Sequence, residues 1–166
     1  VESAFLKENT EAYDIKFQTR KMMKVKIEMD IDPPLLFQTE QRVLDRPYVF
    51  PVRCIALPDL FAGKLNALVY RAWQTRIKGR DWYDFAWYVR NNVPLNWIHL
   101  QERIREFTGE IITPKQFTEM LLDKLANSNI EMVKKDVVGF VDNPRELDFW
   151  TNDYFLNLAT KINWIE

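Results

Sequence analysis

The chain has 166 residues, 47% of them hydrophobic and 14% aromatic, with a formal net charge of −1. This length fits one domain or one and a half, and the composition supports a buried core and excludes a disordered chain. One cysteine and one histidine exclude a disulfide framework and argue against a Cys/His zinc site.

The sequence also limits where the protein works. No apolar run is long enough for a transmembrane helix and no signal peptide opens the chain, so we expect a cytoplasmic protein without a membrane partner. Residues 57–90 carry six basic and three acidic side chains, so the basic excess lies in this stretch. The first residue is Val1 rather than Met, and we expect the chain to be a fragment.

The N-terminal third reads as strands. Residues 1–7 and 12–19 are predicted to be short strands, and the strongest strand is predicted at 24–32, KVKIEMDID. On that strand Lys24, Lys26, Glu28, Asp30 and Asp32 share one face. This face is either an exposed surface with balanced charges or one whose carboxylates hold a metal. Residues 35–50 are expected to be a long connection, and residues 51–56 a short strand.

From Leu57 the pattern becomes helical. The first predicted helix has Pro58 and Asp59 in its first turn and an apolar stripe interrupted by Lys64. The stripe consists of Leu60, Phe61, Leu65, Leu68 and Ala72. After a basic connector, a second helix places Trp82, Phe85, Ala86 and Val89 on one face, and Asp81, Asp84 and Tyr88 on the adjoining face.

Helices are also predicted in the rest of the chain. One begins at Pro94 and stops near Gly109, and Thr113 to Gln116 form a capping box that begins the next. Residues 128–131 repeat the box pattern, Asn143-Pro144 opens a turn, and Thr151 caps a last helix. The predicted fold is therefore α+β, with a mainly antiparallel partial sheet at residues 1–56 and a helical domain at 57–166.

Lys64 is the most informative single residue. Burying an unpaired ammonium group costs roughly several kcal/mol of folding free energy, even after the structure relaxes. The Lys64 side chain therefore either reaches water or faces an anion. Asp81 and Asp84 are close enough in sequence to be that anion. We therefore expect Lys64 within salt-bridge distance of one of them, and this pair could be structural or catalytic.

The connector between the two helices is strongly basic. Arg76, Lys78 and Arg80 are donors suited to phosphate, and Gly79 permits a close backbone approach. The alternative is a solvated loop. No glycine-rich phosphate loop and no Ser/His/Asp triad can be assigned, and Cys54 is expected in the core.

Three stretches together carry a family resemblance: KIEMDIDPP, ALPDLFAGKLNALVYRAW and RIKGRDWYDFAWYV. They resemble the AbiEii/AbiGii-type nucleotidyltransferase toxins of the DNA polymerase β-like superfamily, most strongly over residues 24–90. The family pattern maps residue by residue as follows: Lys26 and Glu28 match its strand motif, Lys64 its helical lysine, and Arg80, Asp81 and Asp84 its Arg-Asp-x-x-Asp helix. Its first part, Gly-Ser followed by Asp-x-Asp, is missing from residues 1–166.

The resemblance implies a toxin that transfers a nucleotide from an NTP to an RNA or protein acceptor, with Mg²⁺ and a separately encoded antitoxin. It implies that residues 1–56 are half of a nucleotidyltransferase palm. Glu28 would face the same cleft as Lys64, where it would bind metal and orient the nucleophile. Lys64 and Arg80 would neutralise phosphates. Asp81 would orient Lys64 or bind the base or the ribose. Nucleotide binding would be completed by Lys26, Arg76, Lys78 and Asp84.

Without the first motif, we expect the chain alone to be inactive. The alternative is that it is a non-catalytic remnant that binds a nucleotide or a protein partner.

Overall fold

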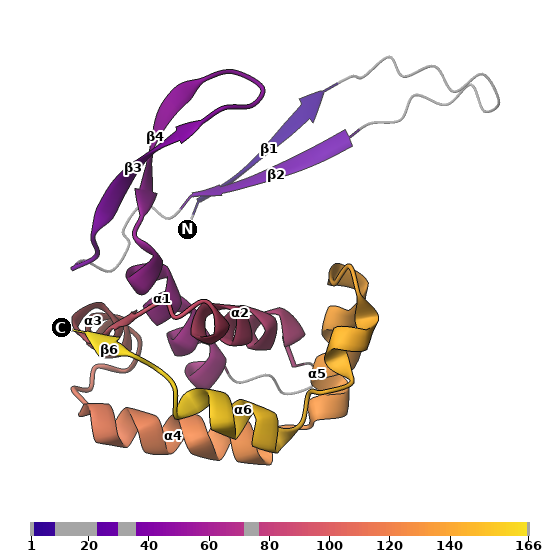
Figure 1. The fold of residues 1–166 in the computed structure, drawn as a ribbon. Coiled ribbons are helices and arrows are strands. Elements are labelled where there is room, and N and C mark those ends of the chain that lie inside the picture. Colours follow the sequence, from indigo (N-terminus) through magenta and orange to yellow (C-terminus); the bar gives the residue numbers. More distant parts are fainter. Residues whose placement is uncertain (1, 9–22, 30–35, 72–76, 166) are drawn as a thin grey trace. The chain divides into compact units, whose positions relative to one another are not determined.

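The computed structural model describes residues 2–8, 23–29, 36–71 and 77–165 (Figure 1). Contacts between residues divide the chain into two compact units, Val1–Pro33 and Pro34–Glu166. The described residues of the first unit, 2–8 and 23–29, form strands, and the second unit contains a hairpin followed by helices. This mixture confirms the predicted α+β class, while the predicted domain boundary after residue 56 stays a prediction.

The described part of the first unit is a two-stranded antiparallel sheet. Strand β1 (Glu2–Glu8) pairs with β2 (Met23–Met29), and Phe5 lies opposite Lys26. Both strands agree with the sequence pattern over these residues. The predicted strand at 12–19 and the aspartates at 30 and 32 lie outside the described residues.

The second unit begins with a β-hairpin of which the sequence predicted the second strand, at residues 51–56, and not the first. Strand β3 (Thr39–Leu44) pairs antiparallel with β4 (Phe50–Ile55), so the predicted long connection at 35–50 is wrong over β3. Most of β3 is exposed, including Val43 and Leu44. A strand without a buried face shows no apolar alternation, which is why the pattern missed it. Cys54, expected in the core, is only partly buried on β4.

Helices build the rest of the second unit. Their bounds are α1 (Leu57–Tyr70), α2 (Gly79–Arg90), α3 (Trp97–Thr108), α4 (Pro114–Asn127), α5 (Ile130–Val137) and α6 (Asn152–Ala159). Two 3₁₀ turns, η1 (Val138–Phe140) and η2 (Pro144–Leu147), separate α5 from α6. Strands β5 (Leu95–Asn96) and β6 (Trp164–Ile165) pair in parallel and bring the C-terminal segment back to α3. Among the described residues, no helix is both long and apolar enough to cross a membrane.

Several helix ends agree with the sequence signals. The Thr113 hydroxyl accepts from Gln116 N–H, and the Gln116 side-chain oxygen accepts from Thr113 N–H. The predicted capping box of α4 is therefore confirmed. Thr151 caps α6 as predicted. The cap of α5 is Asn129 alone, and α3 begins at Trp97 behind an Asn96 cap rather than at Pro94.

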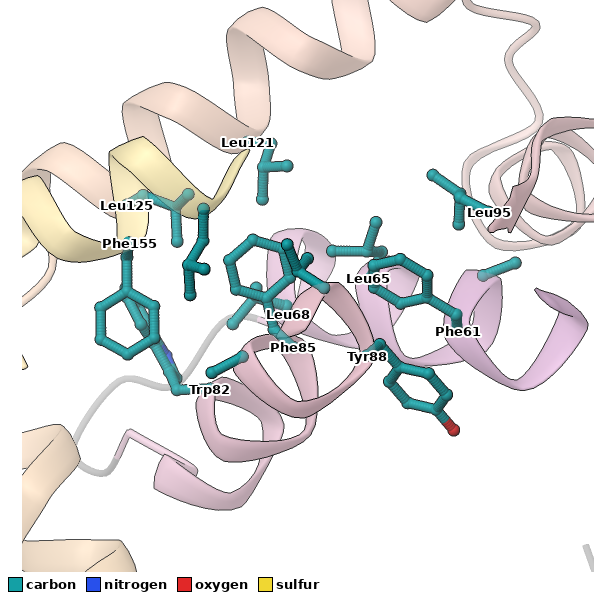
Figure 2. Close-up of a cluster of buried hydrophobic side chains, with 14 of the residues drawn as sticks. Phe61, Leu65, Leu68, Trp82, Phe85, Tyr88, Leu95, Leu121, Leu125 and Phe155 are labelled. Carbon is teal, nitrogen blue, oxygen red and sulfur yellow. The ribbon is translucent and has the colours of Figure 1, made fainter. Parts of the chain in front are cut away.

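The core of this unit is built around α1 and α2 (Figure 2). Phe61, Leu65 and Leu68 of α1 are buried against Phe85 and other side chains of α2, and Trp82 meets Phe155 of α6 edge to face at 4.7 Å. Figure 2 also shows Leu121 and Leu125 of α4 beside this cluster. Leu60, placed in the stripe by sequence, is 40% exposed, and Ala62 is buried instead. The buried face of α1 is therefore rotated from the predicted one, away from Leu60 and towards Ala62.

A buried carboxylate fixes the start of α1. Asp59 is 1% exposed and accepts hydrogen bonds from Gln38 N–H at 2.9 Å and Asn96 Nδ2 at 2.7 Å. The side-chain oxygen of the same Asn96 amide accepts from His99 N–H at 3.1 Å and so caps α3. Asp59 therefore ties the segment before β3, helix α1 and helix α3 together.

Candidate functional site

Lys64 lies at the edge of the α1–α2 contact. Its Nζ is 2.5 Å from Oδ2 of Asp84 and 3.8 Å from Oδ1 of Asp81. The prediction that Lys64 meets one of these carboxylates is confirmed, and it meets both. The Lys64 side chain remains 40% exposed, so it has both an anionic partner and access to solvent.

Asp81 is the buried member of this group. Its side chain is 5% exposed, and its Oδ2 accepts a hydrogen bond from Arg71 Nη1 at 3.3 Å. Two cations therefore hold this carboxylate, Lys64 of α1 on one oxygen and Arg71, the C-cap residue of α1, on the other. Arg71 was missed by sequence reasoning, although it follows Lys64 by seven residues and so lies on the same helix face.

Helix α2 begins where it packs on α5. The Gly79 N–H donates to Oδ2 of Asp136 at 2.9 Å, and a Cβ on Gly79 would lie 2.3 Å from the Val133 carbonyl oxygen. The close approach expected of Gly79 thus serves the contact between α2 and α5. It does not present a backbone N–H to a ligand, because Asp136 already accepts that bond.

These contacts border a pocket of about 380 Å³. Its lining residues are Lys64, Lys78, Arg80, Asp81, Tyr83, Asp84, Val137 and Phe140. The pocket therefore brings together five residues that the sequence singled out, from α1, from the first turns of α2 and from the residue before it. Three cations and two carboxylates face it, which leaves a net positive charge suited to an anionic ligand.

The far wall of the pocket comes from the end of α5 and from η1. The Arg80 guanidinium lies over the Phe140 ring, 5.0 Å from its centroid, and the ring is 64% exposed. Sequence reasoning missed Val137 and Phe140 because they follow Arg80 by 57 and 60 positions. No local pattern indicates such a long-range contact.

Tyr88 lies on the same helix, one turn beyond Asp84. Burial, and secondly the negative charge of Asp84, raise the pKa of the Tyr88 phenol. Its ring stacks on Phe61 with 4.8 Å between centroids. Tyr88 is therefore a neutral core residue at ordinary pH and takes no part in charge balance at the pocket.

Other predicted site residues cannot be placed at the pocket. Arg76 lies outside the described residues, and so do the side chains of Lys26 and Glu28 on β2. The prediction that Glu28 faces the same cleft as Lys64 therefore stays a prediction.

The pocket itself does not fit a magnesium site. Mg²⁺ is bound by carboxylate oxygens and water in near-octahedral geometry, but both pocket carboxylates are already paired with cations. Within the part of the chain that the structure describes, no group of three Asp, Glu, His or Cys residues is arranged to hold a metal ion. The pocket residues present instead the chemistry of an anion site.

Fold and pocket together define an α+β protein in which a helical unit carries a cationic pocket with a paired lysine. The family model described as nucleotidyl transferase AbiEii toxin, type IV toxin–antitoxin system, matches residues 3–157. The chain belongs to this family, which confirms the resemblance drawn from its motifs. Neither the curated proteins nor the solved structures contain a significant match to the chain.

Proposed function

We propose that this pocket binds the triphosphate of an NTP, and that the chain supplies the cationic side of a nucleotidyltransferase site. The observation that carries the proposal is the meeting of Lys64, Asp81, Asp84 and Arg80 around one pocket. Family membership supports a nucleotidyltransferase toxin. Nucleotidyl transfer joins an acceptor oxygen to the α-phosphorus and releases pyrophosphate, with an RNA or a protein hydroxyl as acceptor.

Each pocket residue has a role that its contacts support. Lys64 and Arg80 neutralise phosphate oxygens, because both are cations on the pocket wall with solvent access. Asp81 acts as a positioning residue: it is buried, and its hydrogen bond to Arg71 fixes the carboxylate that Lys64 faces. Asp84 is partly exposed, and its oxygen gives Lys64 a partner that a phosphate can replace.

The transfer step needs carboxylates that are not part of this pocket. In the proposal, Glu28 on β2 would be one residue that holds Mg²⁺, and the ion would supply charge neutralisation for the phosphates and activation of the acceptor hydroxyl. One carboxylate holds this ion weakly, and the Gly-Ser followed by Asp-x-Asp is absent from residues 1–166. We therefore expect the 166-residue chain to bind NTPs but to transfer nucleotides weakly or not at all on its own.

A second candidate function is binding without catalysis. It is favoured by the pairing of both Asp81 oxygens with cations, which makes a stable ion-pair network and leaves no carboxylate for a metal in the pocket. Such a module would bind a nucleotide or a protein partner. In either case the family places the protein beside a separately encoded antitoxin.

Nucleotide binding is tested first. Isothermal titration with each NTP, with and without Mg²⁺, should show binding that weakens as salt rises, because partly exposed charge pairs are screened. Lys64→Ala should lower affinity roughly tenfold, since a hydrogen bond to a charged group contributes about 1.5–3 kcal/mol. The matched control is Lys161→Ala, an exposed lysine outside the pocket, which should bind as the unmodified chain does.

Transfer is tested with a labelled NTP and a pool of small RNAs. Little or no labelling by the 166-residue chain is expected. Robust labelling that persists in Lys64→Ala would overturn the site assignment. Robust labelling that Lys64→Ala abolishes would support the site and show that the missing motif is dispensable. NTP binding that Lys64→Ala leaves unchanged would contradict the proposed pocket itself.

A further inference from the structure

A second pocket of about 300 Å³ lies directly beside the first, and Tyr83 lines both. Helix α2 supplies most of the wall of this second pocket. The rest comes from Glu146 of η2 and from Trp150, which follows η2. The motifs of the sequence say nothing about this pocket. A ligand in this second pocket would therefore lie next to a ligand in the first pocket.

Three aromatic side chains surround this second pocket. Trp150 is 4% exposed, and its ring lies 6.3 Å from that of Tyr83 with 38° between their planes. Trp87, one turn after Tyr83 on α2, also lines the pocket and is 42% exposed. A large aromatic side chain with this much exposed surface beside a pocket offers a planar ligand a stacking face.

The rim carries polar groups of both kinds. Arg90 offers guanidinium donors, and Glu146 offers carboxylate acceptors. Both side chains are exposed. The neighbouring Asn91 is held in place because its Nδ2 donates to the Trp87 carbonyl oxygen at 2.8 Å. Planar faces with donors and acceptors at their edge match a nucleobase, whose own edge carries both.

The two pockets together favour a polymer over a free base. Around them stand four cations, Lys64, Lys78, Arg80 and Arg90, against three carboxylates, Asp81, Asp84 and Glu146. A single strand of nucleic acid presents alternating phosphates and unstacked bases, so it can place a base in the second pocket while the net positive charge around both pockets attracts its phosphates. A duplex keeps its bases stacked and offers none to Trp87.

We propose that the pocket formed by Tyr83, Trp87, Trp150, Arg90 and Glu146 binds a nucleobase of single-stranded nucleic acid by stacking on Trp87. The pocket gives the chain a strand-binding site next to its phosphate-binding site. In the proposed function this strand is the acceptor, and that assignment rests on the proposed function. The strand-binding site itself does not depend on nucleotide transfer.

Binding of fluorescently labelled ten-nucleotide single strands, of RNA and of DNA, to the full 166-residue chain tests the proposal by fluorescence polarisation. Trp87→Ala should weaken binding roughly 5- to 150-fold, the range for one stacked base. Trp87→Phe should retain much of the affinity because it keeps an aromatic face. Arg90→Ala should weaken binding and reduce its salt dependence.

Phe107→Ala is the matched control, because Phe107 is a 65% exposed aromatic residue on α3 that lines neither pocket. It should bind strands as the unmodified chain does. Circular dichroism of each variant shows that it is folded. NTP titrations run in parallel report on the first pocket, so strand binding that depends on Trp87 stands even where NTP binding fails.

Three outcomes would overturn the proposal. The first is equal strand affinity in Trp87→Ala and Phe107→Ala. The second is a duplex that binds as tightly as the single strand, since this indicates backbone attraction alone. The third is no strand binding at all combined with Trp87-dependent binding of an unstructured Ser/Thr-rich peptide, which would assign the pocket to a protein ligand.

Discussion

The Lys64 ammonium group lies 2.5 Å from the Asp84 carboxylate and joins α1 to α2 in the wall of the first pocket. Both side chains keep solvent access, 40% for Lys64 and 32% for Asp84. A pair of this kind contributes only about 0–1 kcal/mol to folding. Replacing Asp84 by a phosphate oxygen therefore costs the fold little, which suits a lysine that binds a ligand.

The first prediction follows from this small contribution. Lys64→Met keeps the aliphatic stem and removes the charge, so it should lower the free energy of unfolding by about 1 kcal/mol or less. Urea denaturation followed by circular dichroism measures it, with Lys161→Met as control. A loss of more than about 2 kcal/mol would mean that the lysine is mainly a structural tie, well beyond the range of an exposed pair.

A second prediction concerns the contact between α2 and α5. Gly79→Ala should destabilise the protein by roughly 1–3 kcal/mol, because its Cβ would overlap the Val133 backbone oxygen and α5 would have to move. It should also weaken NTP binding, since Val137 and Phe140 of the pocket wall follow on the same segment. Thermal unfolding measures the first effect and titration the second.

Gly139→Ala provides the control for that experiment. A Cβ at Gly139 would meet no atom within 4 Å, and an exposed substitution of this kind changes stability by about 0.5 kcal/mol or less. Equal stability of the two alanine variants would show that α5 yields easily, and the tight packing assigned to Gly79 would be wrong.

The sequence predicted much of the candidate site because its signals are local. Lys64 and the aspartates of α2 are separated by 17 and 20 positions, and helical periodicity placed them on facing surfaces. The four residues predicted on the buried face of α2, Trp82, Phe85, Ala86 and Val89, are all buried, and Gly79, Asp81 and Tyr88 are buried in addition. The capping box of α4 depends only on a hydroxyl and an amide three residues apart.

What the sequence did not show depends on contacts between distant segments. Phe140 reaches Arg80, and Asp136 reaches Gly79, through the way α5 packs on α2. The β3 strand is held by backbone pairing with β4, and its exposed side chains carry no periodic signal. Asp59 was predicted as a residue of the first helical turn, yet its two hydrogen bonds reach 21 and 37 residues away.

The third prediction tests the capping box. Thr113→Ala should cost about 1 kcal/mol, because the N–H of Gln116 loses its acceptor at the start of α4. Thr118→Ala is the control: its hydroxyl only bonds back to the Pro114 carbonyl oxygen, so its loss should change stability little. The two variants are compared by their denaturant midpoints, provided that their unfolding free energies depend equally on denaturant concentration. Equal midpoints would contradict the predicted loss in Thr113→Ala.

A fourth prediction concerns alkaline pH. The pKa of Tyr88 is raised, first by burial and then by Asp84, so the neutral phenol is favoured in the folded state. This contribution is fully present below the unfolded-state pKa of about 10 and is lost as pH rises through the higher folded-state pKa. Stability should therefore decline above about pH 10, and Tyr88→Phe should lessen that decline. Ultraviolet titration of the two proteins at 295 nm should show one late-titrating tyrosine missing from the variant.

The fifth prediction addresses the buried carboxylate at the start of α1. Asp59→Ala leaves the Gln38 N–H and the Asn96 amide without their acceptor, and each buried donor left unsatisfied costs about 1–3 kcal/mol. We expect a loss of roughly 3 kcal/mol in unfolding free energy. Asp59→Asn should lose less, because one oxygen remains to accept one of the two bonds. Asp153→Ala is the matched control, an exposed aspartate in the first turn of α6 whose removal forfeits only about 0.3–1 kcal/mol of dipole interaction. Equal losses in Asp59→Ala and Asp153→Ala would mean that Asp59 acts only on the helix dipole and does not hold the segment before β3 and helix α3 to α1.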